Sequence, residues 1–98
     1  MTTDLTTPVI NNDVGTSSIL GNPHNVLLFN DSVHGMGEVS AQIIKATHCS
    51  SERAVAIMYE AHSKGSAVVF SGSKERCEHI ESILAGPPTR LTTSIEPA

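Results

Sequence analysis

A short, uninterrupted apolar run places the strongest limit on what this chain can fold into. Residues 26–29 read Val-Leu-Leu-Phe, between His24 and Asn30. Four to eight apolar residues bounded by polar and turn-forming residues are typical of a strand in the middle of a sheet. We therefore predict a strand over residues 24–30 that is buried on both faces. The rest of the chain must then supply the elements that cover it.

Three helices and two further strands are predicted after this run. Apolar residues recur at helical spacing from Met36 to Thr47, and again over 54–61, between a capping Ser50 and a terminating Gly65. A third helix is predicted to begin after Ser73 and to end before residues 86–88, which read Gly-Pro-Pro, and short strands are predicted over 67–70 and 90–95. The order β-α-α-β-α-β predicts an α+β fold, a small three-stranded antiparallel sheet with three helices packed on it.

The first part of the chain has a different composition. Thr, Asn, Asp, Ser and Gly dominate residues 1–22, and the few aliphatic residues there show no sustained period. Such a composition buries too little apolar surface to offset the entropy lost on ordering. We predict a flexible N-terminal tail over residues 1–22 and one small domain over residues 23–98, with Pro23 at the boundary.

Charge and hydropathy exclude several classes of partner. No Lys or Arg occurs before Lys45, while Asp4, Asp13, Asp31 and Glu38 precede it. Nucleic acid is not expected as a partner, because phosphate binding needs clustered cations. A cationic ligand would suit this acidic half, although ordinary solvated acids explain it equally well. The longest apolar run is too short to cross a bilayer and no secretory signal is evident, so we expect no membrane partner and a cytoplasmic location.

Cysteine and histidine spacing predicts neither a metal site nor a catalytic centre. Cys49 and Cys77 stand alone, without paired metal-ligand spacing, and are expected to be reduced. A cysteine with a histidine could form a nucleophile pair, but neither cysteine has a Gly-rich elbow nearby and Cys77 lies in a helical apolar stripe. We therefore expect no cofactor and no enzyme activity. No metal-ligand spacing is found either for the histidines His24, His34, His48 and His79.

Two short segments carry the polar groups that best indicate a function. Asn30 and Asp31 follow the first strand, and His62 ends the second helix, four residues after Met58. With Met36 nearby, these groups could hold a ligand that has one cationic end and one apolar end. Taken singly, each residue has an ordinary explanation: Asn and Asp form turns, a helix-end His suits the helix dipole, and Met fills core gaps.

The order of these residues resembles the ClpS family, adaptors that select N-degron substrates for the Clp protease. The shared features are a strand followed by Asn30 and Asp31, Met36 opening the first helix, and Met58 and His62 closing the second. The resemblance runs from about residue 26 to residue 75 and returns at 91–96, but it does not cover residues 1–22. It implies a Clp AAA+ unfoldase of the ClpA or ClpC type as partner, together with substrate proteins that carry hydrophobic N-terminal residues.

The resemblance also implies roles for individual residues. In the family, the residues matching Asn30, Asp31 and His62 hold the α-amino group of the substrate's first residue. That residue's side chain, of the Leu, Phe, Tyr and Trp class, enters an apolar pocket, where Met36 resembles the residue that screens out β-branched side chains. Glu75 matches a position that faces the unfoldase. The positions that match the hydrophobic pocket are Met36, Val39, Ile43, Met58, Ala61 and Leu91.

The chain departs from the family pattern at four positions, which leaves the preferred N-terminal residue open. The family often has an acidic residue at Ser32, a Thr at His34 and a Pro at Gly35, and a Val is usual at Ala61. The loop is therefore expected to be less charged, and the pocket to differ in depth or width. A second interpretation stays open, a non-catalytic protein-interaction domain of the ribosomal L7/L12 C-terminal type, with similar topology and no pocket for an N-terminal residue.

Overall fold

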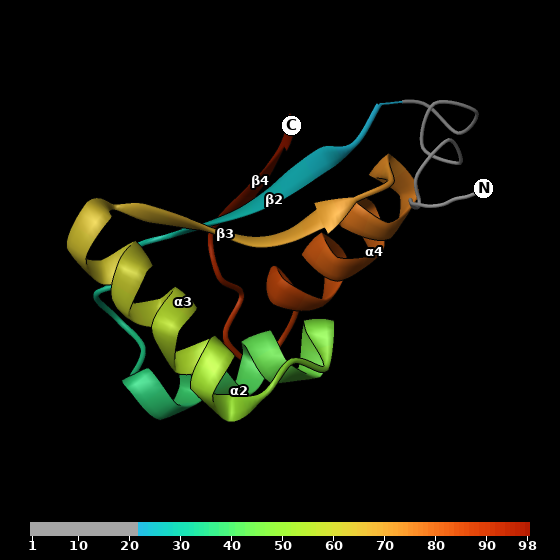
Figure 1. The fold of residues 1–98 in the computed structure, drawn as a ribbon. Coiled ribbons are helices and arrows are strands. Elements are labelled where there is room, and N and C mark those ends of the chain that lie inside the picture. The colour runs from blue at the N-terminus through green and yellow to red at the C-terminus, as the bar shows by residue number, and fades with distance from the viewer. Residues whose placement is uncertain (1–21) are drawn as a thin grey trace.

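The computed structural model describes residues 22–98, in which three helices cover one face of a three-stranded antiparallel sheet (Figure 1). The strand order in the sheet is β3-β2-β4, so the first predicted strand is central. This confirms the predicted α+β fold and its β-α-α-β-α-β order. The predicted tail lies outside the described residues except for Asn22. In chain order the elements are β2 (His24–Phe29), α2 (Met36–Thr47), α3 (Ser51–Lys64), β3 (Ser66–Gly72), α4 (Lys74–Leu84) and β4 (Thr93–Pro97).

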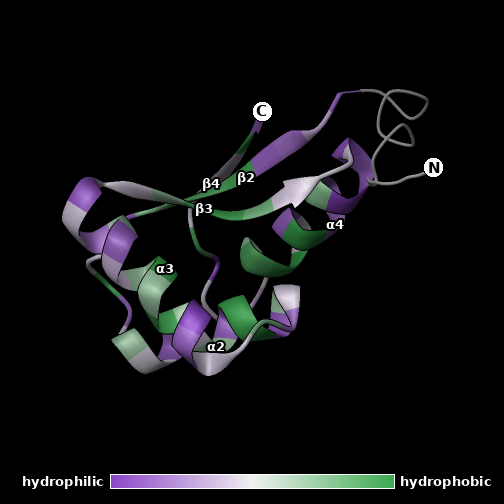
Figure 2. Ribbon diagram, in the orientation of Figure 1, coloured by the Kyte–Doolittle hydropathy of each residue, from purple (hydrophilic) through white to green (hydrophobic). Residues whose placement is uncertain are grey.

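Strand β2 is central but is not buried on both faces. Val26 and Leu28 are 0% and 1% exposed, whereas Leu27 and Phe29 between and after them are only half-buried. The prediction of burial on both faces was therefore wrong. The three helices all pack against the same face, and hydrophobic residues gather between the helices and the sheet (Figures 1 and 2). The alternation of a one-sided sheet is hidden in the sequence, because apolar residues occupy both faces of this strand.

The helices begin and end largely where the sequence predicts. The hydroxyl oxygen of Ser50 accepts a hydrogen bond from the Arg53 N–H at 3.0 Å, and that of Ser73 accepts one from the Arg76 N–H at 3.2 Å. Helix α3 ends at Gly65, whose φ of 95° lies in the left-handed region that favours glycine. Helix α2 ends at His48 with φ 60°, an end that its sequence does not signal.

The last strand begins later than predicted. The sequence indicated a strand over residues 90–95, but β4 spans Thr93–Pro97. Arg90 has φ 49°, and the Leu91 N–H donates to the Leu84 carbonyl at 3.0 Å, so the chain still follows the end of α4 at this point. Leu91 is 3% exposed and belongs to the core instead of the sheet.

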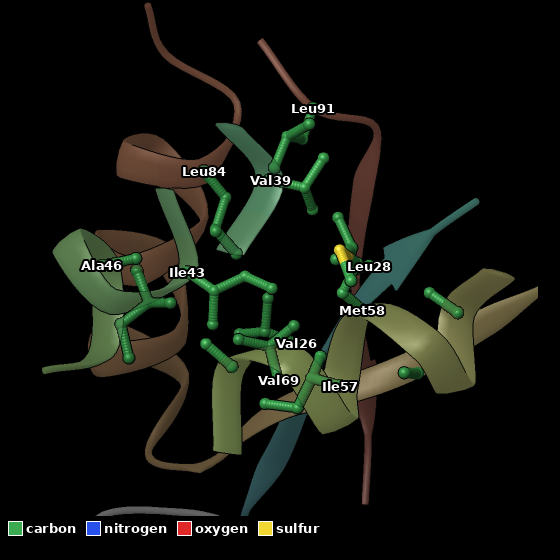
Figure 3. Packing of buried hydrophobic residues seen from close by; sticks show 14 of the residues in the cluster. Val26, Leu28, Val39, Ile43, Ala46, Ile57, Met58, Val69, Leu84 and Leu91 are labelled. Atoms are coloured by element: carbon green, nitrogen blue, oxygen red, sulfur yellow. The ribbon is translucent and has the colours of Figure 1, made fainter. Parts of the chain in front are cut away.

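The core lies between the sheet and the helices, and Figure 3 shows its packing. Cys77 is fully buried there, and its thiol contacts the His24 carbonyl oxygen at 3.4 Å. Burial raises the pKa of the Cys77 thiol, and the charge of Glu78 raises it further against an opposing hydrogen bond to Gly72. A buried thiol of raised pKa is a poor nucleophile, which argues against a catalytic cysteine at this position. The buried hydrophobic residues are Val26, Leu28, Val39, Ile43, Ala46, Ala54, Ile57, Met58, Ala61, Ala67, Val69, Cys77, Ile80, Leu84 and Leu91.

We expect two Gly→Ala substitutions to change stability in opposite directions. Gly65→Ala places a residue with a Cβ in the left-handed region and should lower the free energy of unfolding by about 1–2 kcal/mol. Gly37 lies in the first turn of α2, where an added Cβ meets nothing within 4 Å. Gly37→Ala should therefore raise the free energy of unfolding by about 0.4–1 kcal/mol. Thermal unfolding followed by circular dichroism should show a lower midpoint for the first and a higher one for the second. Shifts of the same sign would contradict this account of the helix end.

Candidate functional site

A pocket of about 210 Å³ opens where β2 leads into the loop before α2, beside the C-terminal half of α3. In Figure 1 this region lies at the left, where the yellow end of α3 approaches the end of β2. The pocket joins a polar end, formed by the loop and the last turn of α3, to an apolar end formed by α2 and α3. It is lined by Leu28, Phe29, Asn30, Asp31, His34, Met36, Val39, Met58, Tyr59, Ala61 and His62.

Backbone pairing explains why distant residues meet at this pocket. Phe29 at the end of β2 pairs with Ser66 at the start of β3. The next N–H, that of Asn30, donates to the Gly65 carbonyl at 3.0 Å. Gly65 ends α3 directly after the turn that carries His62. The end of the first strand and the end of the second helix are therefore fixed side by side, which brings together Asn30, Asp31 and His62.

The three predicted amine-binding residues all line the pocket, but their surroundings differ. Asn30 and His62 are exposed at the polar end, and no described residue engages the side chain of either in a hydrogen bond. The carboxylate of Asp31, by contrast, already has hydrogen-bond partners within the loop. Its Oδ1 accepts hydrogen bonds from the backbone N–H of Val33 at 2.6 Å and of His34 at 3.0 Å, and its Oδ2 lies 2.6 Å from Nδ1 of His34. Of the three predicted amine-binding side chains, Asp31 is thus the one that already has partners within the loop.

These contacts keep Asp31 charged. Partial burial is the largest single effect and raises the pKa of Asp31, but the His34 ring and the two backbone N–H groups together outweigh it. The pKa of Asp31 is therefore lower than its ordinary value. A carboxylate of lowered pKa adds stability above its unfolded-state pKa and loses it as the pH falls through the folded-state pKa. At neutral pH the pocket consequently contains a fixed negative charge.

The apolar end is formed by α2 and α3. Val39, Met58 and Ala61 are 5%, 8% and 3% exposed and form the inner wall, whereas Met36 is 50% exposed at the start of α2. A half-exposed, flexible thioether at this place borders the pocket opening. Four of the predicted hydrophobic positions therefore lie at the pocket.

Ile43 and Leu91, the other two predicted hydrophobic positions, do not line the pocket. They are 0% and 3% exposed and lie in the core (Figure 3). Ile43 lies one helical turn beyond Val39 on α2, away from the opening, and Leu91 packs where the chain leaves α4. Both belong to the hydrophobic core that continues beyond the inner wall of the pocket.

The structure adds residues that the sequence did not indicate. Tyr59 is 53% exposed on α3 and lines the pocket beside Met58, three residues before His62. That helical spacing, which places residues on one face, could have identified it. His34, given no role from the sequence, lines the pocket through its contact with Asp31. No periodicity signals a side-chain contact within an irregular loop.

The charge of the pocket limits its ligands. Among the described residues, its wall contains one carboxylate and two histidines and no Lys or Arg. The described part of the chain also holds no group of three or more His, Cys, Asp or Glu residues placed to bind a metal ion. None of the helices seen in residues 22–98 is long and apolar enough to cross a membrane. The arrangement suits a small cation attached to an apolar group.

Glu75 lies far from this pocket. It is exposed in the first turn of α4, directly after the end of β3. Gly72 at that end pairs with His24, the first residue of β2, while the pocket lies at the last residue of β2. Glu75 and the pocket are therefore at opposite ends of the sheet.

Comparison with known proteins identifies a family and a similar fold. A family model described as the ATP-dependent Clp protease adaptor protein ClpS matches residues 21–86, which include the whole pocket wall. Among solved structures, the fold is similar to that of Agrobacterium tumefaciens ClpS2 bound to L-phenylalaninamide. The two chains are 22% identical, with a TM-score of 0.72 over 79% of this chain and 98% of that one. At this identity the structural likeness concerns the fold. No curated protein sequence matches the chain.

Proposed function

The chain belongs to the ClpS family of ATP-dependent Clp protease adaptors, and from this we propose that its pocket binds the free N-terminus of substrate proteins. The observation that carries the proposal is the meeting of Asn30, Asp31 and His62 at one end of the pocket with apolar residues of α2 and α3 at the other. An N-terminal residue has the matching shape, a cationic amine attached to a side chain.

The polar end suits an α-amino group. With a reference pKa of about 7.7–8.0, this group is mostly cationic at neutral pH and offers three hydrogen-bond donors. Asn30 offers a carbonyl oxygen, Asp31 a charged carboxylate, and neutral His62 a ring nitrogen. A residue inside a chain has an amide at this position, which supplies one donor and no charge. Selection for a chain end would therefore come from these polar groups, since polar groups that a bound peptide covers but does not match cost far more than a missing methylene.

The apolar end suits a large hydrophobic first side chain. L-phenylalaninamide, which the similar A. tumefaciens ClpS2 binds, combines a free α-amino group with an aromatic side chain. In this chain Val39, Met58 and Ala61 form an inner wall without charge. The proposed substrates accordingly begin with residues of the Leu, Phe, Tyr and Trp class. The alternative of an L7/L12-type interaction domain assumed no such pocket, so the pocket itself favours the adaptor.

We propose further that the end of the sheet distant from the pocket faces a Clp AAA+ unfoldase of the ClpA or ClpC type. Glu75 is the residue proposed for this contact, because it is exposed in the first turn of α4. Its position at the opposite end of β2 leaves the pocket free while the unfoldase is bound. The adaptor could then hold a substrate and its partner at the same time.

Binding should require an unblocked N-terminus. A fluorescent peptide beginning with Phe should bind, and acetylation of its amine should weaken binding by at least about 100-fold, because it removes the charge and two donors. Asp31→Ala and His62→Ala should each weaken binding about tenfold or more by removing an acceptor. Fluorescence anisotropy measures these affinities. Ser32→Ala, at an exposed position beside Asp31, is the matched control and should bind as the parent does. Equal affinity for the acetylated peptide would exclude the proposal.

Met36 should restrict the shape of the first side chain. Met36→Ala should increase affinity for peptides beginning with Ile or Val by about tenfold, the scale of one or two methyl groups in a pocket, because the opening becomes wider. Val33→Ala is the control, since Val33 is 85% exposed in the same loop and does not line the pocket. A peptide series that differs only in its first residue tests this. An unchanged order of preference would show that Met36 does not select the side chain.

Glu75→Ala should slow substrate delivery without weakening peptide binding. The measurement is degradation of an N-degron substrate by a reconstituted ClpA- or ClpC-type unfoldase with its peptidase. Glu52→Ala is the matched control, because Glu52 is also an exposed first-turn acid, but on α3. Delivery at the parent's rate by the Glu75 variant would remove this residue from the contact.

A further inference from the structure

We infer that His34 is a positioning residue of the amine site, which holds Asp31 in its binding geometry and makes ligand affinity depend on pH. This inference rests on the proposed function, because it names a further residue of the same pocket. Its basis is the contact between His34 Nδ1 and Asp31 Oδ2 at 2.6 Å. The side chains of His34 and Asp31 are 24% and 15% exposed, so the pair is largely shielded but still reached by solvent.

The hydrogen bonds of Asp31 leave one direction open to a ligand. A carboxylate has about four lone-pair sites. Both sites on Oδ1 are used by the backbone N–H groups of Val33 and His34, and one site on Oδ2 is used by the His34 ring. The remaining site on Oδ2 is the acceptor available to an ammonium group. Since the backbone contacts hold only Oδ1, the His34 ring is what fixes the direction of the remaining Oδ2 lone pair.

The protonation state of His34 changes what a cation meets at this position. Neutral His34 donates through Nδ1 and leaves the full negative charge of Asp31 for the ligand. Protonated His34 forms an ion pair with Asp31 and places a second cation beside the ammonium, which weakens binding.

Other titratable groups face the same space and enter the pH dependence. From α3, Tyr59 and His62 line the pocket with His34, while Asn30 at the end of β2 is uncharged. From α2, Glu38 caps the loop by accepting the Gly35 N–H at 2.8 Å. Of these, His62 is the other imidazole, and its protonated form also repels the ammonium. A bound ammonium disfavours the protonated form of either ring, so peptide binding to the parent should be accompanied by proton release at acidic pH.

Two substitutions separate positioning from charge. His34→Asn keeps a donor close to the place of Nδ1 but cannot become charged, and His34→Ala removes both. At pH 7.5 we expect the affinity of the Asn variant for the Phe peptide to lie within about threefold of the parent. The Ala variant should bind about five- to tenfold more weakly, the loss of one net hydrogen bond. His79→Asn, an exposed histidine on α4 outside the pocket, is the control and should match the parent.

The pH profile supplies the readout that a merely structural role would not change. Between pH 6.5 and 5.5 the peptide amine is almost fully charged, so the slope of log Kd against pH counts protons released from the protein. We expect this slope to be smaller in both His34 variants than in the parent, by up to about one proton. Carboxyl NMR titration should show the pKa of Asp31 higher in the Ala variant than in the parent, since the ring contact lowers it.

The outcomes distinguish this inference from the proposed function. If the parent binds the Phe peptide but both variants show the parent's affinity and slope, His34 has no part in the site and only this inference fails. If the parent binds no peptide with a free hydrophobic N-terminus, the proposed function itself fails. Weaker binding by the Ala variant with restoration by the Asn variant, and a reduced slope in both, is the expected result.

Discussion

The hydrogen bond from the Asn30 N–H to the Gly65 carbonyl, 3.0 Å long, joins the end of strand β2 to the end of helix α3. The geometry of the pocket depends on it, because this bond and the adjacent pairing of Phe29 with Ser66 hold the loop that carries Asp31 beside the helical turn that carries His62. Gly65 accepts this bond in a left-handed conformation, with φ 95°. The glycine that ends helix α3 thus also helps to align the polar groups of the site.

The two ends of the pocket are built in different ways. The inner wall uses side chains of α2 and α3 that are also part of the core, so its shape is set by packing and cannot vary without affecting stability. The polar end uses a loop stabilised by the Asp31 contacts and exposed residues such as Asn30, which contribute little to the core. Substitutions in the inner wall would therefore also affect folding, whereas substitutions at the half-exposed Met36 or at the polar end would do so much less.

Backbone features that depend on residues close together in the sequence could be predicted, whereas features that depend on distant residues or on side-chain geometry could not. The strand at Val26, the caps at Ser50 and Ser73 and the stop at Gly65 depend on neighbouring residues, and they were found. The open outer face of β2 was missed because it depends on where helices far along the chain pack. Within the candidate site, the position of Ile43 behind the pocket and the contact of His34 with Asp31 depend on side-chain geometry, which spacing does not encode.

The hydrogen bonds that Asp31 accepts within the loop also affect how well its carboxylate could bind inorganic cations. Ca²⁺ requires about six to eight oxygen ligands and Mg²⁺ a near-ideal octahedron. Asp31 offers a single free lone-pair site, and the described residues supply no neighbouring cluster of acids to complete a coordination shell. An ammonium group, by contrast, needs only a few directed acceptors. Because most of its lone pairs are used within the loop, Asp31 would be a poor ligand for divalent ions and would keep one acceptor for the proposed amine.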